Sequence, residues 1–431
     1  MLYDIGFFIF SIIYLPVLIF KGKLHREFPE RFGRYDKAKE RALLSGSGRI
    51  WIQAVSVGEV ALCKSLIPLL KEKFSADDLV ISTITRAGND LAKRLFSKEA
   101  IVIYFPLDFA FTVKRAVEFI KPRIYIMIET EIWPNLLKEL SLNSVPSILI
   151  NGRISDRSIG KYRLVKPYLK NALRNIRVFC MQDIIDGMRI TELGAPSDRV
   201  KVTGNMKFDI EAPVNILTSD AIRRSFGVKT GDELFVAGST HSGEEEIIVE
   251  AFKELAFEFP RLKLLIAPRH IERVEEVEKI IRKSGFQSTR ISRLNDKRYT
   301  IDDKRYTIND KRIMILDTYG CLNDAYLAAT IVFIGGSLIK HGGQNPIEPA
   351  VSGRAILFGP HMFNFKYVTN VLLREEAALL VSGKEELIKF SKMLLRDVSK
   401  RSKLGDNAKR IVADNRGATK KNFQQISEIL R

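Results

Sequence analysis

Cysteine and histidine are scarce in this chain of 431 residues, which contains three cysteines and five histidines. Cys63, Cys180 and Cys321 lie far apart and share no metal-ligand spacing, so the sequence predicts a reducing compartment without a disulfide or zinc framework. The histidines form no HExxH motif or comparable ligand pair. We therefore predict no protein-bound catalytic metal.

Several common signatures of function are also missing. No G-x-S-x-G motif occurs, which argues against a hydrolase with a nucleophile elbow. The glycines around Ser337 match neither G-x-G-x-x-G nor a P-loop. No basic stretch is interleaved with aromatic residues and no DNA-binding helix motif is recognisable, so we predict no nucleic-acid partner.

Acidic residues are outnumbered, because 51 Asp and Glu stand against 69 Lys and Arg, a formal net charge of +18. Such an excess suits an anionic partner, whether nucleic acid, phosphorylated lipid or an acidic membrane face. The 46% hydrophobic and 28% charged residues are near globular averages. The length suits two domains, which is enough for an enzyme.

The N-terminus is apolar, since from Leu2 to Phe20 only Asp4 is charged, which is just long enough to cross a bilayer. Basic residues follow this run rather than precede it, which favours an anchor over a cleaved signal peptide. Eight basic and four acidic residues lie between Lys21 and Arg41, so the rest of the chain is predicted to be cytoplasmic. A shallow monotopic insertion and a buried core helix are the alternatives.

Beyond this segment, short β-branched runs alternate with helical stretches. Their continuous apolarity indicates burial on both faces, which is typical of a parallel sheet covered by helices. We predict an α/β fold of two doubly wound, Rossmann-like domains that face a cleft at the carboxyl ends of their strands. The runs include "RIWIQAVSV", "LVISTIT", "AIVIYFPL", "RIYIMIE", "LFVAGST", "LKLLIAPR", "RIMILDT" and "TIVFIGG".

The predicted domains are an anchor at 1–20, a first α/β domain at 21–208, a polar linker at 209–220 and a second α/β domain at 221–431. Whether the last helix crosses back to the first domain stays open. Residues 295–313 repeat a seven-residue unit without a coiled-coil seam. This stretch predicts a solvated surface insertion, with a basic finger for anionic headgroups as the alternative.

Glu59 lies where the strand before "VSVGE" ends and a helix begins. An acid at a helix N-terminus is common and accounts for Glu59 by itself. A general base is the functional alternative, because Gly58 permits a tight turn and close approach of a ligand. This stretch alone leaves both interpretations open.

"MIETEIWPN" repeats the arrangement, with Glu129 and Glu131 after a buried strand. Two carboxylates at one strand end are hard to explain by helix capping alone. Lys207 follows another strand in "TGNMKFD" and could balance Glu129 or a developing negative charge. A solvated lysine is the alternative.

The second half has features of a nucleotide site. His241 precedes a helix at a turn suited to anions, and Arg269 follows another strand. In "FIGGSLIKHGGQNPIEP", glycines would let backbone N–H groups approach phosphate, and Glu348 could accept from a ribose diol. The pattern predicts a nucleotide in the second domain.

Taken in order, these motifs resemble the 3-deoxy-D-manno-octulosonic acid (Kdo) transferases of lipopolysaccharide synthesis over essentially the whole chain. The motifs are "AVSVGEV", "FPLDF", "MIETEIWPN", "NGRISDRS", "VTGNMKFD", "STHSGEEE", "PRHIER", "FIGGSLIKHGGQNPIEP" and "GPHMFNF". The resemblance implies a two-domain GT-B glycosyltransferase. It implies that Kdo moves from CMP-Kdo to the lipid A precursor at the cytoplasmic face of the bacterial inner membrane, with inversion and without a metal or other cofactor.

The resemblance also assigns roles to residues. Glu59 matches the general base of the family, and Glu129 and Lys207 match positions that stabilise the transition state. The residues that match CMP-binding positions are Pro268, Arg269, Tyr319, Gly320, Cys321, Asn345, Pro346, Ile347 and Glu348. The phosphates and acyl chains of the acceptor suit a basic surface and an anchor, with anionic inner-membrane lipids as further partners.

Three departures from the family pattern stand out. Tyr319, Gly320 and Cys321 replace a usual Met-Gly-Glu, so a glutamate is missing there. Gln53 and Gln344 each occupy a position where the family usually has histidine. These changes bear on donor affinity and acceptor range.

Two rival functions are weighed against this one. The first is a GT-B transferase that uses a UDP-sugar, which competition by CMP against UDP would distinguish. The second is a basic, membrane-associated binding protein, which predicts steep salt dependence and no need for Glu59.

Overall fold

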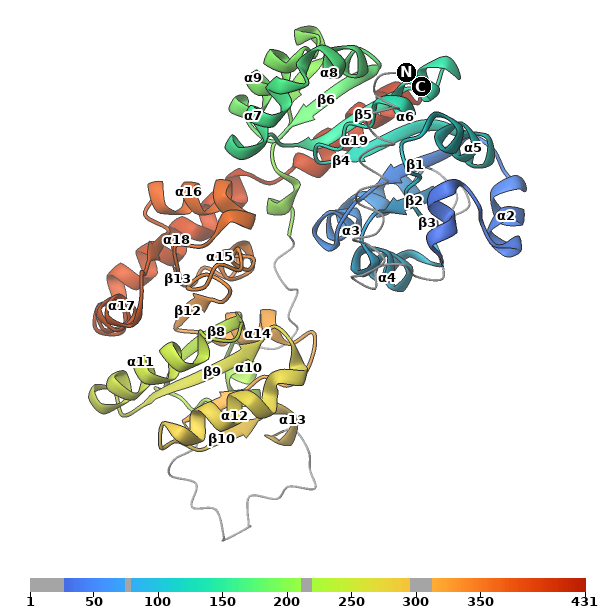
Figure 1. Cartoon of the computed structure of the whole chain (residues 1–431). Helices are drawn as coiled ribbons and strands as arrows, with labels where there is room; N and C mark the ends of the chain where they lie inside the picture. Colours follow the sequence, from blue (N-terminus) through green and yellow to red (C-terminus); the bar gives the residue numbers. More distant parts are fainter. Residues whose placement is uncertain (1–26, 74–78, 211–218, 295–311) are drawn as a thin grey trace. The chain divides into compact units, whose positions relative to one another are not determined.

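The computed structural model describes residues 27–73, 79–210, 219–294 and 312–431 (Figure 1). Contacts divide the chain into unit 1, which contains the residues up to Asp209 and Asn415–Arg431, and unit 2, Ile210–Asp414. The predicted anchor at 1–20, most of the predicted linker and nearly all of the 295–313 repeat lie outside the described residues. Within the described ranges, no helix is both long and apolar enough to cross a membrane.

Unit 1 is built on a seven-stranded sheet with the order β3-β2-β1-β4-β5-β6-β7. Every neighbouring pair is parallel, as the continuous apolar runs predict. The strands are β1 (Arg49–Gln53), β2 (Leu79–Thr83), β3 (Ile101–Tyr104), β4 (Pro122–Ile128), β5 (Ser147–Gly152), β6 (Ile176–Met181) and β7 (Val200–Val202).

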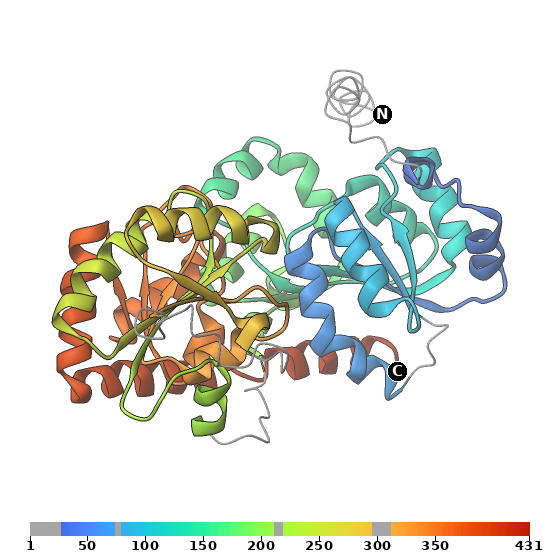
Figure 2. The ribbon, with the colours of Figure 1, turned by 90° about the horizontal axis from the view of Figure 1, so that it is seen from below.

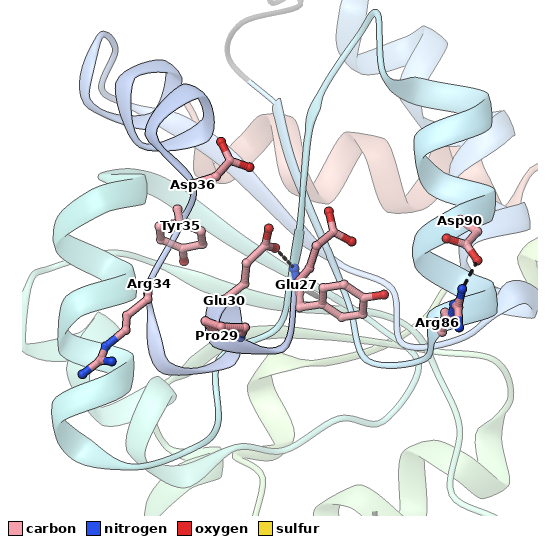
Figure 3. A pocket seen from close by; sticks show the side chains of 9 residues that line it. Glu27, Pro29, Glu30, Arg34, Tyr35, Asp36, Arg86 and Asp90 are labelled. Carbon is pink, nitrogen blue, oxygen red and sulfur yellow. Dashed lines mark hydrogen bonds and ion pairs between the residues drawn. The ribbon is translucent and has the colours of Figure 1, made fainter. Parts of the chain in front are cut away.

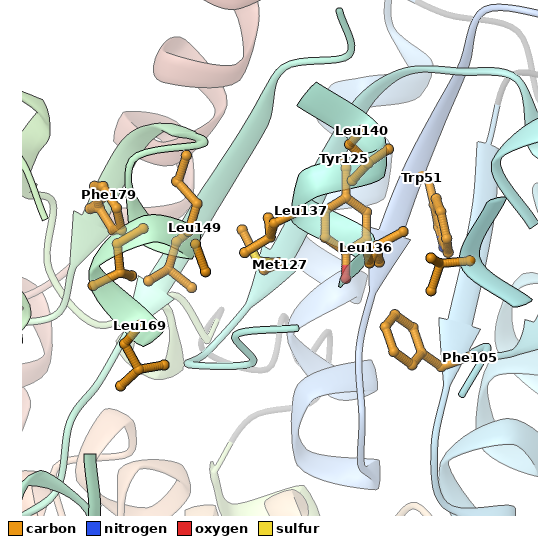
Figure 4. Packing of buried hydrophobic residues seen from close by; sticks show 14 of the residues in the cluster. Trp51, Phe105, Tyr125, Met127, Leu136, Leu137, Leu140, Leu149, Leu169 and Phe179 are labelled. Atoms are coloured by element: carbon orange, nitrogen blue, oxygen red, sulfur yellow. The ribbon is translucent and has the colours of Figure 1, made fainter. Parts of the chain in front are cut away.

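Helices cover both faces of this sheet because successive strand residues point to opposite sides. Ile50 and Ile52 of β1 belong to one core cluster. Trp51, between them, belongs to the cluster on the opposite face, which Figure 4 shows. The helices of unit 1 are α2 (Lys37–Leu44), α3 (Val57–Lys71), α4 (Arg86–Phe96), α5 (Ala110–Ile120), α6 (Pro134–Leu142), α7 (Asp156–Leu164), α8 (Lys166–Leu173), α9 (Ile184–Leu193) and α19 (Ala418–Ile429), with short 3-10 turns η1 (Phe28–Phe32), η3 (Ser197–Arg199) and η4 (Met206–Phe208).

The C-terminal helix α19 belongs to unit 1 and packs against α3 and β5 (Figure 2). Its N-terminus is capped by Asp209, whose carboxylate accepts from the backbone N–H groups of Gly417 at 2.6 Å and Thr419 at 2.5 Å. A carboxylate at a helix N-terminus satisfies N–H groups that have no partner within the helix. The last helix therefore holds the segment that carries Lys207 against the sheet.

Unit 2 repeats the architecture with a second seven-stranded parallel sheet, in the order β10-β11-β9-β8-β12-β13-β14. The strands are β8 (Glu233–Thr240), β9 (Leu262–Pro268), β10 (Ser288–Arg290), β11 (Ile313–Ile315), β12 (Ile331–Ile334), β13 (Ala355–Phe358) and β14 (Ala378–Leu380). The helices are α10 (Ser219–Ser225), α11 (Glu245–Glu258), α12 (Val274–Lys283), α13 (Ile291–Leu294), α14 (Leu322–Ala328), α15 (Ile347–Val351), α16 (Lys366–Arg374), α17 (Lys384–Arg396) and α18 (Val398–Asp414), with 3-10 turns η5 (Ile271–Arg273) and η7 (Phe363–Phe365).

The predicted fold class is confirmed, since each unit is a doubly wound α/β sheet. All strands of a parallel sheet end at the same edge. The loops that follow them are where such sheets bind ligands. We therefore expect the functional residues of each unit at this edge of its sheet.

Candidate functional site

Glu59 turns back onto the junction between β1 and α3. Its carboxylate accepts from Val55 N–H at 2.5 Å and from Ser56 Oγ at 3.0 Å. Ser56 is the N-cap of α3 and its hydroxyl makes no capping bond of its own. Glu59 thus makes the helix-terminus contacts that the sequence allowed, in the manner of a capping box.

Helix capping does not account for the electrostatics of Glu59. Burial raises the pKa of its carboxyl to about 8, the nearby Glu129 carboxylate adds to the rise, and the bonds from Val55 and Ser56 oppose it. A capping carboxylate in water would instead have its pKa lowered by those bonds and by the helix dipole. A carboxyl group so strongly perturbed is typical of a functional site.

Glu129 lies directly after β4, the strand that neighbours β1. Its φ of 61° is in the left-handed region, which is unusual for a residue with a side chain. The backbone is held there because Glu129 N–H donates to Ile150 O at 3.0 Å. Glu129 Oε1 lies 3.2 Å from Lys207 Nζ, so the two residues form an ion pair.

Lys207 reaches Glu129 from the far edge of the sheet through a folded-back loop. Met206 N–H donates to the Asn151 Oδ1 atom at 2.9 Å, and Lys207 N–H donates to Asn205 Oδ1 at 3.0 Å. Asn151 is buried at the end of β5 with a φ of 52°. Asn151 therefore draws the loop after β7 across the sheet edge toward β4.

Glu131 and Gln53 lie near the same edge. The Glu131 carboxylate accepts from Trp133 Nε1 at 3.0 Å, and burial raises its pKa to about 7 with a further contribution from Glu129. Gln53 is fully buried, and its Oε1 accepts from Ser82 Oγ. Its Nε2 has no hydrogen-bond partner in the described part of the chain. Nothing in the structure explains why glutamine occupies this position.

In unit 2, the buried Glu244 carboxylate joins two loops at the sheet edge. It accepts from His241 N–H at 3.1 Å after β8, and from three N–H groups after β12, those of Gly336 at 2.6 Å, Ser337 at 2.9 Å and Leu338 at 2.9 Å. The sequence analysis assigned no role to Glu244. No sequence signal identifies it, because three of its four partners lie more than ninety residues away in the chain.

The glycine-rich loop is closely packed against its neighbours. A side chain at Gly335 would clash with the backbone of Ser239, which has a φ of 55°. Ser337 is fully buried, and its Oγ accepts from Gly359 N–H at 2.7 Å. Ser337 therefore braces the loop rather than facing a ligand.

Basic and imidazole groups gather beside this loop. Arg269 N–H donates to Thr240 O at 2.9 Å, while its side chain is exposed. The His241 and His341 rings lie 3.8 Å apart, and Gln344 Nε2 lies 3.0 Å from His241 Nε2. Burial and the neighbouring His341, His270 and arginines lower the pKa of His241 to about 4, so it is neutral at pH 7.

The remaining predicted nucleotide residues lie at the end of β9 or after β11 and β12, and these three strands and β8 are consecutive in the sheet. Pro268, Pro346 and Ile347 are buried, and Tyr319 and Gly320 are exposed. Asn345 orders the start of α15, because its Oδ1 accepts from Ile347 N–H at 3.0 Å and its Nδ2 donates to Glu348 Oε1 at 3.3 Å. Cys321 is the N-cap of α14, which contacts α15. The structure thus brings these residues to one sheet edge.

A hollow lies farther along the unit 1 edge, beside β2 and β3 (Figure 3). It is lined by Glu27, Pro29, Glu30, Arg34, Tyr35, Asp36, Arg86, Asp90 and Tyr104, none of which the sequence predicted as a site residue. Its central acid has partners already, since Glu30 accepts from Tyr104 N–H at 2.9 Å and pairs with Lys39 at 2.5 Å. Among the described residues, no group of three His, Cys, Asp or Glu side chains could hold a metal ion.

The two doubly wound units, with their polar residues at the strand ends, have the GT-B fold. UDP-N-acetylglucosamine 2-epimerase from Neisseria meningitidis shares this fold with a TM-score of 0.55 and 13% identity, over 85% of this chain and 99% of that one. The Anabaena protein HepE in complex with UDP-glucose gives a TM-score of 0.52 and 15% identity, over 89% and 99% of the two chains.

Comparison with sequence relatives identifies the family within this fold. The model of the 3-deoxy-D-manno-octulosonic acid transferase family (kdotransferase) matches residues 26–210. The transferase of that name from Haemophilus influenzae is 31% identical over 97% of this chain and 94% of its own, and the one from Bordetella pertussis is 28% identical over 93% and 91%. The chain belongs to the 3-deoxy-D-manno-octulosonic acid transferase family and is a glycosyltransferase.

Replacement of Asn151 tests how Lys207 is held. Asn151→Ala should lower the free energy of unfolding of unit 1 by about 2 kcal/mol, because Met206 N–H loses its buried acceptor. Asn151→Gly should be about 1 kcal/mol less damaging, since glycine adopts a φ of 52° without strain. Urea unfolding followed by tryptophan fluorescence measures this in unit 1, which contains both tryptophans. Wild-type stability in Asn151→Ala would contradict the assigned role.

Replacement of Glu244 tests the connection between the unit 2 loops. Glu244→Gln puts an NH₂ donor against N–H groups and should cost about 3 kcal/mol locally. Hydrogen exchange of the Gly336, Ser337 and Leu338 amides should then accelerate about 100-fold. Glu246→Gln, on the exposed face of the same helix, is the matched control and should leave that exchange unchanged. Equal exchange in the two variants would refute the role of Glu244.

Proposed function

We propose that this protein transfers Kdo from CMP-Kdo to the lipid A precursor during synthesis of the lipopolysaccharide core, with inversion at the anomeric carbon and Glu59 as the general base. The observation that carries the proposal is the buried Glu59 carboxyl, whose pKa is raised to about 8 beside the Glu129–Lys207 ion pair. A general base works best when its pKa lies near the working pH. Family membership supports the sugar that is transferred.

The proposed chemistry is a single displacement. The acceptor hydroxyl oxygen forms a bond to the anomeric carbon of Kdo while the bond from that carbon to the CMP phosphate oxygen breaks. The bonding electron pair leaves with the phosphate, and the hydroxyl proton passes to Glu59. Attack opposite the leaving group inverts the configuration, so only one base is required.

Glu129 and Lys207 would set the charge around this base. The Glu129 carboxylate keeps the pKa of Glu59 high, which makes the Glu59 carboxylate a stronger base once it has lost its proton. Lys207 limits the repulsion by its ion pair with Glu129 and supplies positive charge close to the reacting groups. The pair is held by backbone bonds and needs little rearrangement during the reaction.

Unit 2 would bind the CMP portion of the donor. The exposed Arg269 guanidinium suits the phosphate, and Glu348 suits a ribose diol. The N–H groups of Gly336, Ser337 and Leu338, which the sequence offered for the phosphate, donate to Glu244 instead. Tyr319, Gly320 and Cys321 would line the same edge without the carboxylate that the family usually has there. CMP with its phosphate neutralised in this way is a good leaving group.

We extend the proposal to location and cofactors. The apolar segment 2–20 and the basic residues after it support attachment to the cytoplasmic face of the inner membrane, where anionic lipids would contact the basic surface. The proposed chemistry uses only side chains of the protein and requires no metal ion. Addition of EDTA to the transfer assay tests that requirement directly.

Replacement of Glu59 tests the proposal. Glu59→Gln should retain the fold and CMP binding, because glutamine has nearly the same shape, and should reduce transfer at least 100-fold, because the base is lost. Mass spectrometry of the lipid product after incubation with CMP-Kdo and lipid A precursor measures this. The wild-type rate should rise with pH to a plateau above about 8, since Glu59 must be deprotonated.

Controls separate the proposal from its rivals. CMP should inhibit wild-type transfer and UDP should not, whereas the reverse would indicate a UDP-sugar donor. Glu72→Gln, at the end of α3 and exposed, should transfer at the wild-type rate. Equal transfer by wild type and Glu59→Gln would contradict the role of Glu59, and no transfer by either would contradict the proposed reaction.

A further inference from the structure

Helix α9 and strand β7 enclose a shallow apolar groove at the edge of unit 1, which we call the α9–β7 groove. It is lined by Ile184, Gly187, Met188, Thr191, Glu192, Ser197, Val200 and Val202. Ile184 and Met188 are each 69% exposed and Val202 is 51% exposed. Contiguous apolar surface of this kind on a folded unit marks a contact site for an apolar ligand, a protein or a membrane.

The exposed side chains belong to a helix start that is firmly held. Asp183 caps α9 by accepting from Asp186 N–H at 2.7 Å. Asp186 accepts from Ile154 N–H at 2.7 Å, and Arg189 Nη1 donates to Ile154 O at 2.6 Å. Figure 1 shows α7, α8 and α9 grouped at this end of unit 1. The groove is therefore a formed feature rather than a loosely attached helix.

The groove opens at the same edge of the sheet as the candidate catalytic residues. One end lies at the carboxyl edge of the sheet, where β7 ends at Val202 and the chain continues through Asn205 to Lys207. From Ile184 to Thr191 the α9 wall extends about 10 Å along the groove. A ligand seated here would have one end at the carboxyl edge of the sheet, the edge on which the Glu129–Lys207 pair also lies.

The surroundings of the groove are basic. Glu192, the one acid in the lining, forms an ion pair with Arg163 at 2.7 Å. The hydrogen bond from Arg163 and the charges of Lys166 and Arg189 lower the pKa of its carboxyl. Asp156 pairs with Arg189. The positive charge comes from the whole segment 153–202, which contains eleven Lys or Arg and five Asp or Glu. Lys201 is half-exposed on β7, 3.9 Å from Glu428. An apolar floor with a basic rim matches a lipid that carries phosphate groups.

We infer that the α9–β7 groove binds a fatty acyl chain of the phosphorylated lipid acceptor and so orients the acceptor sugar toward Glu59. This inference rests on the proposed function, because it concerns the acceptor of that reaction. An exposed apolar groove could instead face the interior of a bilayer, independently of the acceptor, or contact a second copy of this chain. Each gives a different result in the experiment below.

Gly187 offers a variant that closes the groove without making it polar. A Cβ atom at Gly187 would lie 3.5 Å from Val200 Cγ1 and 3.9 Å from Val202 Cγ2, which is ordinary contact, so a leucine can extend into the groove. A Cβ atom at Gly160 on α7 would have no neighbour within 4 Å among the described residues. Gly187→Leu and Gly160→Leu are thus matched, since both put leucine into neighbouring helices and only one fills the groove.

The experiment compares transfer from CMP-Kdo to lipid A precursor in detergent micelles with transfer to its fully deacylated sugar phosphate. Gly187→Leu should raise the KM for the acylated acceptor at least tenfold, with kcat and the KM for the deacylated acceptor unchanged. Met188→Ser, on an exposed side chain that folding does not require, should raise the same KM about threefold. Gly160→Leu should behave as wild type.

Several results would overturn the inference. Wild-type kinetics in Gly187→Leu, or equal effects of both leucine variants, would exclude the groove as an acyl site. Loss of binding to phosphatidylethanolamine–phosphatidylglycerol vesicles with an unchanged micellar KM would assign the groove to the bilayer. A change of oligomeric state in sedimentation would assign it to a second copy.

A labelling experiment keeps this inference separate from the proposed function. Lipid A precursor with a diazirine in one acyl chain should cross-link to residues 184–202 on illumination, whether or not sugar is transferred. If wild type transfers nothing but labels these residues, the proposed reaction fails and the acyl site stands. Labelling confined to other segments would overturn the acyl site, even in an active enzyme.

Discussion

The burial of the Glu59 carboxyl beside the Glu129 carboxylate is the constraint on which the candidate site of unit 1 depends. Two acids on adjacent strand ends repel each other when both are charged, and burial adds to the cost of the Glu59 charge. The folded protein therefore holds a proton on Glu59 that the unfolded chain releases. Because the pKa is raised on folding, the contribution of Glu59 to stability falls as pH rises from about 4.5 to about 8 and does not change further above that range.

The structure limits this repulsion with the charge of Lys207, which the backbone geometry brings to Glu129. Glu129 and Asn151 both have positive φ angles at the ends of neighbouring strands. Such angles are unfavourable for residues other than glycine and persist where surrounding contacts enforce them. Here the turn at Glu129 directs its carboxylate toward Lys207, and Asn151 holds the loop that carries Lys207 across the edge of the sheet. Ser239 in unit 2 has the same kind of backbone at the end of β8, where Glu244 joins two loops.

The fold was largely predictable, because buried parallel strands have continuous apolar sequences and end in recognisable turns. "RIWIQ" and "LFVAG" follow this rule, and both lie in the centre of their sheets. The positions of Glu59 and Glu129 at strand ends follow from the same pattern, whereas the pairing of β1 with β4, which makes those ends adjacent, is known only from the structure. Their roles in catalysis stay predictions, as do those of Lys207 and the CMP-binding residues.

Other features depend on contacts that one sequence does not encode locally. Glu244 and Asn151 look like ordinary polar residues until the chain folds, since their partners come from distant segments. The pKa of Glu59 likewise depends on burial and on Glu129, seventy residues away. The α9–β7 groove could not be predicted from the sequence either, because apolar residues in a helix are usually taken for core residues and these are exposed. Local patterns predict elements, whereas these sites arise from their packing.

The central claim is that folding itself makes Glu59 a base suited to neutral or slightly alkaline pH. Direct titration of the carboxyl group by ¹³C NMR, with glutamate labelled at Cδ, tests it without any substrate. The spectrum of Glu59→Gln assigns the resonance by its disappearance. The account predicts a midpoint near pH 8, well above the ordinary value of 4.5. A midpoint near 4.5 would contradict it, because Glu59 would then be an ordinary helix-end acid.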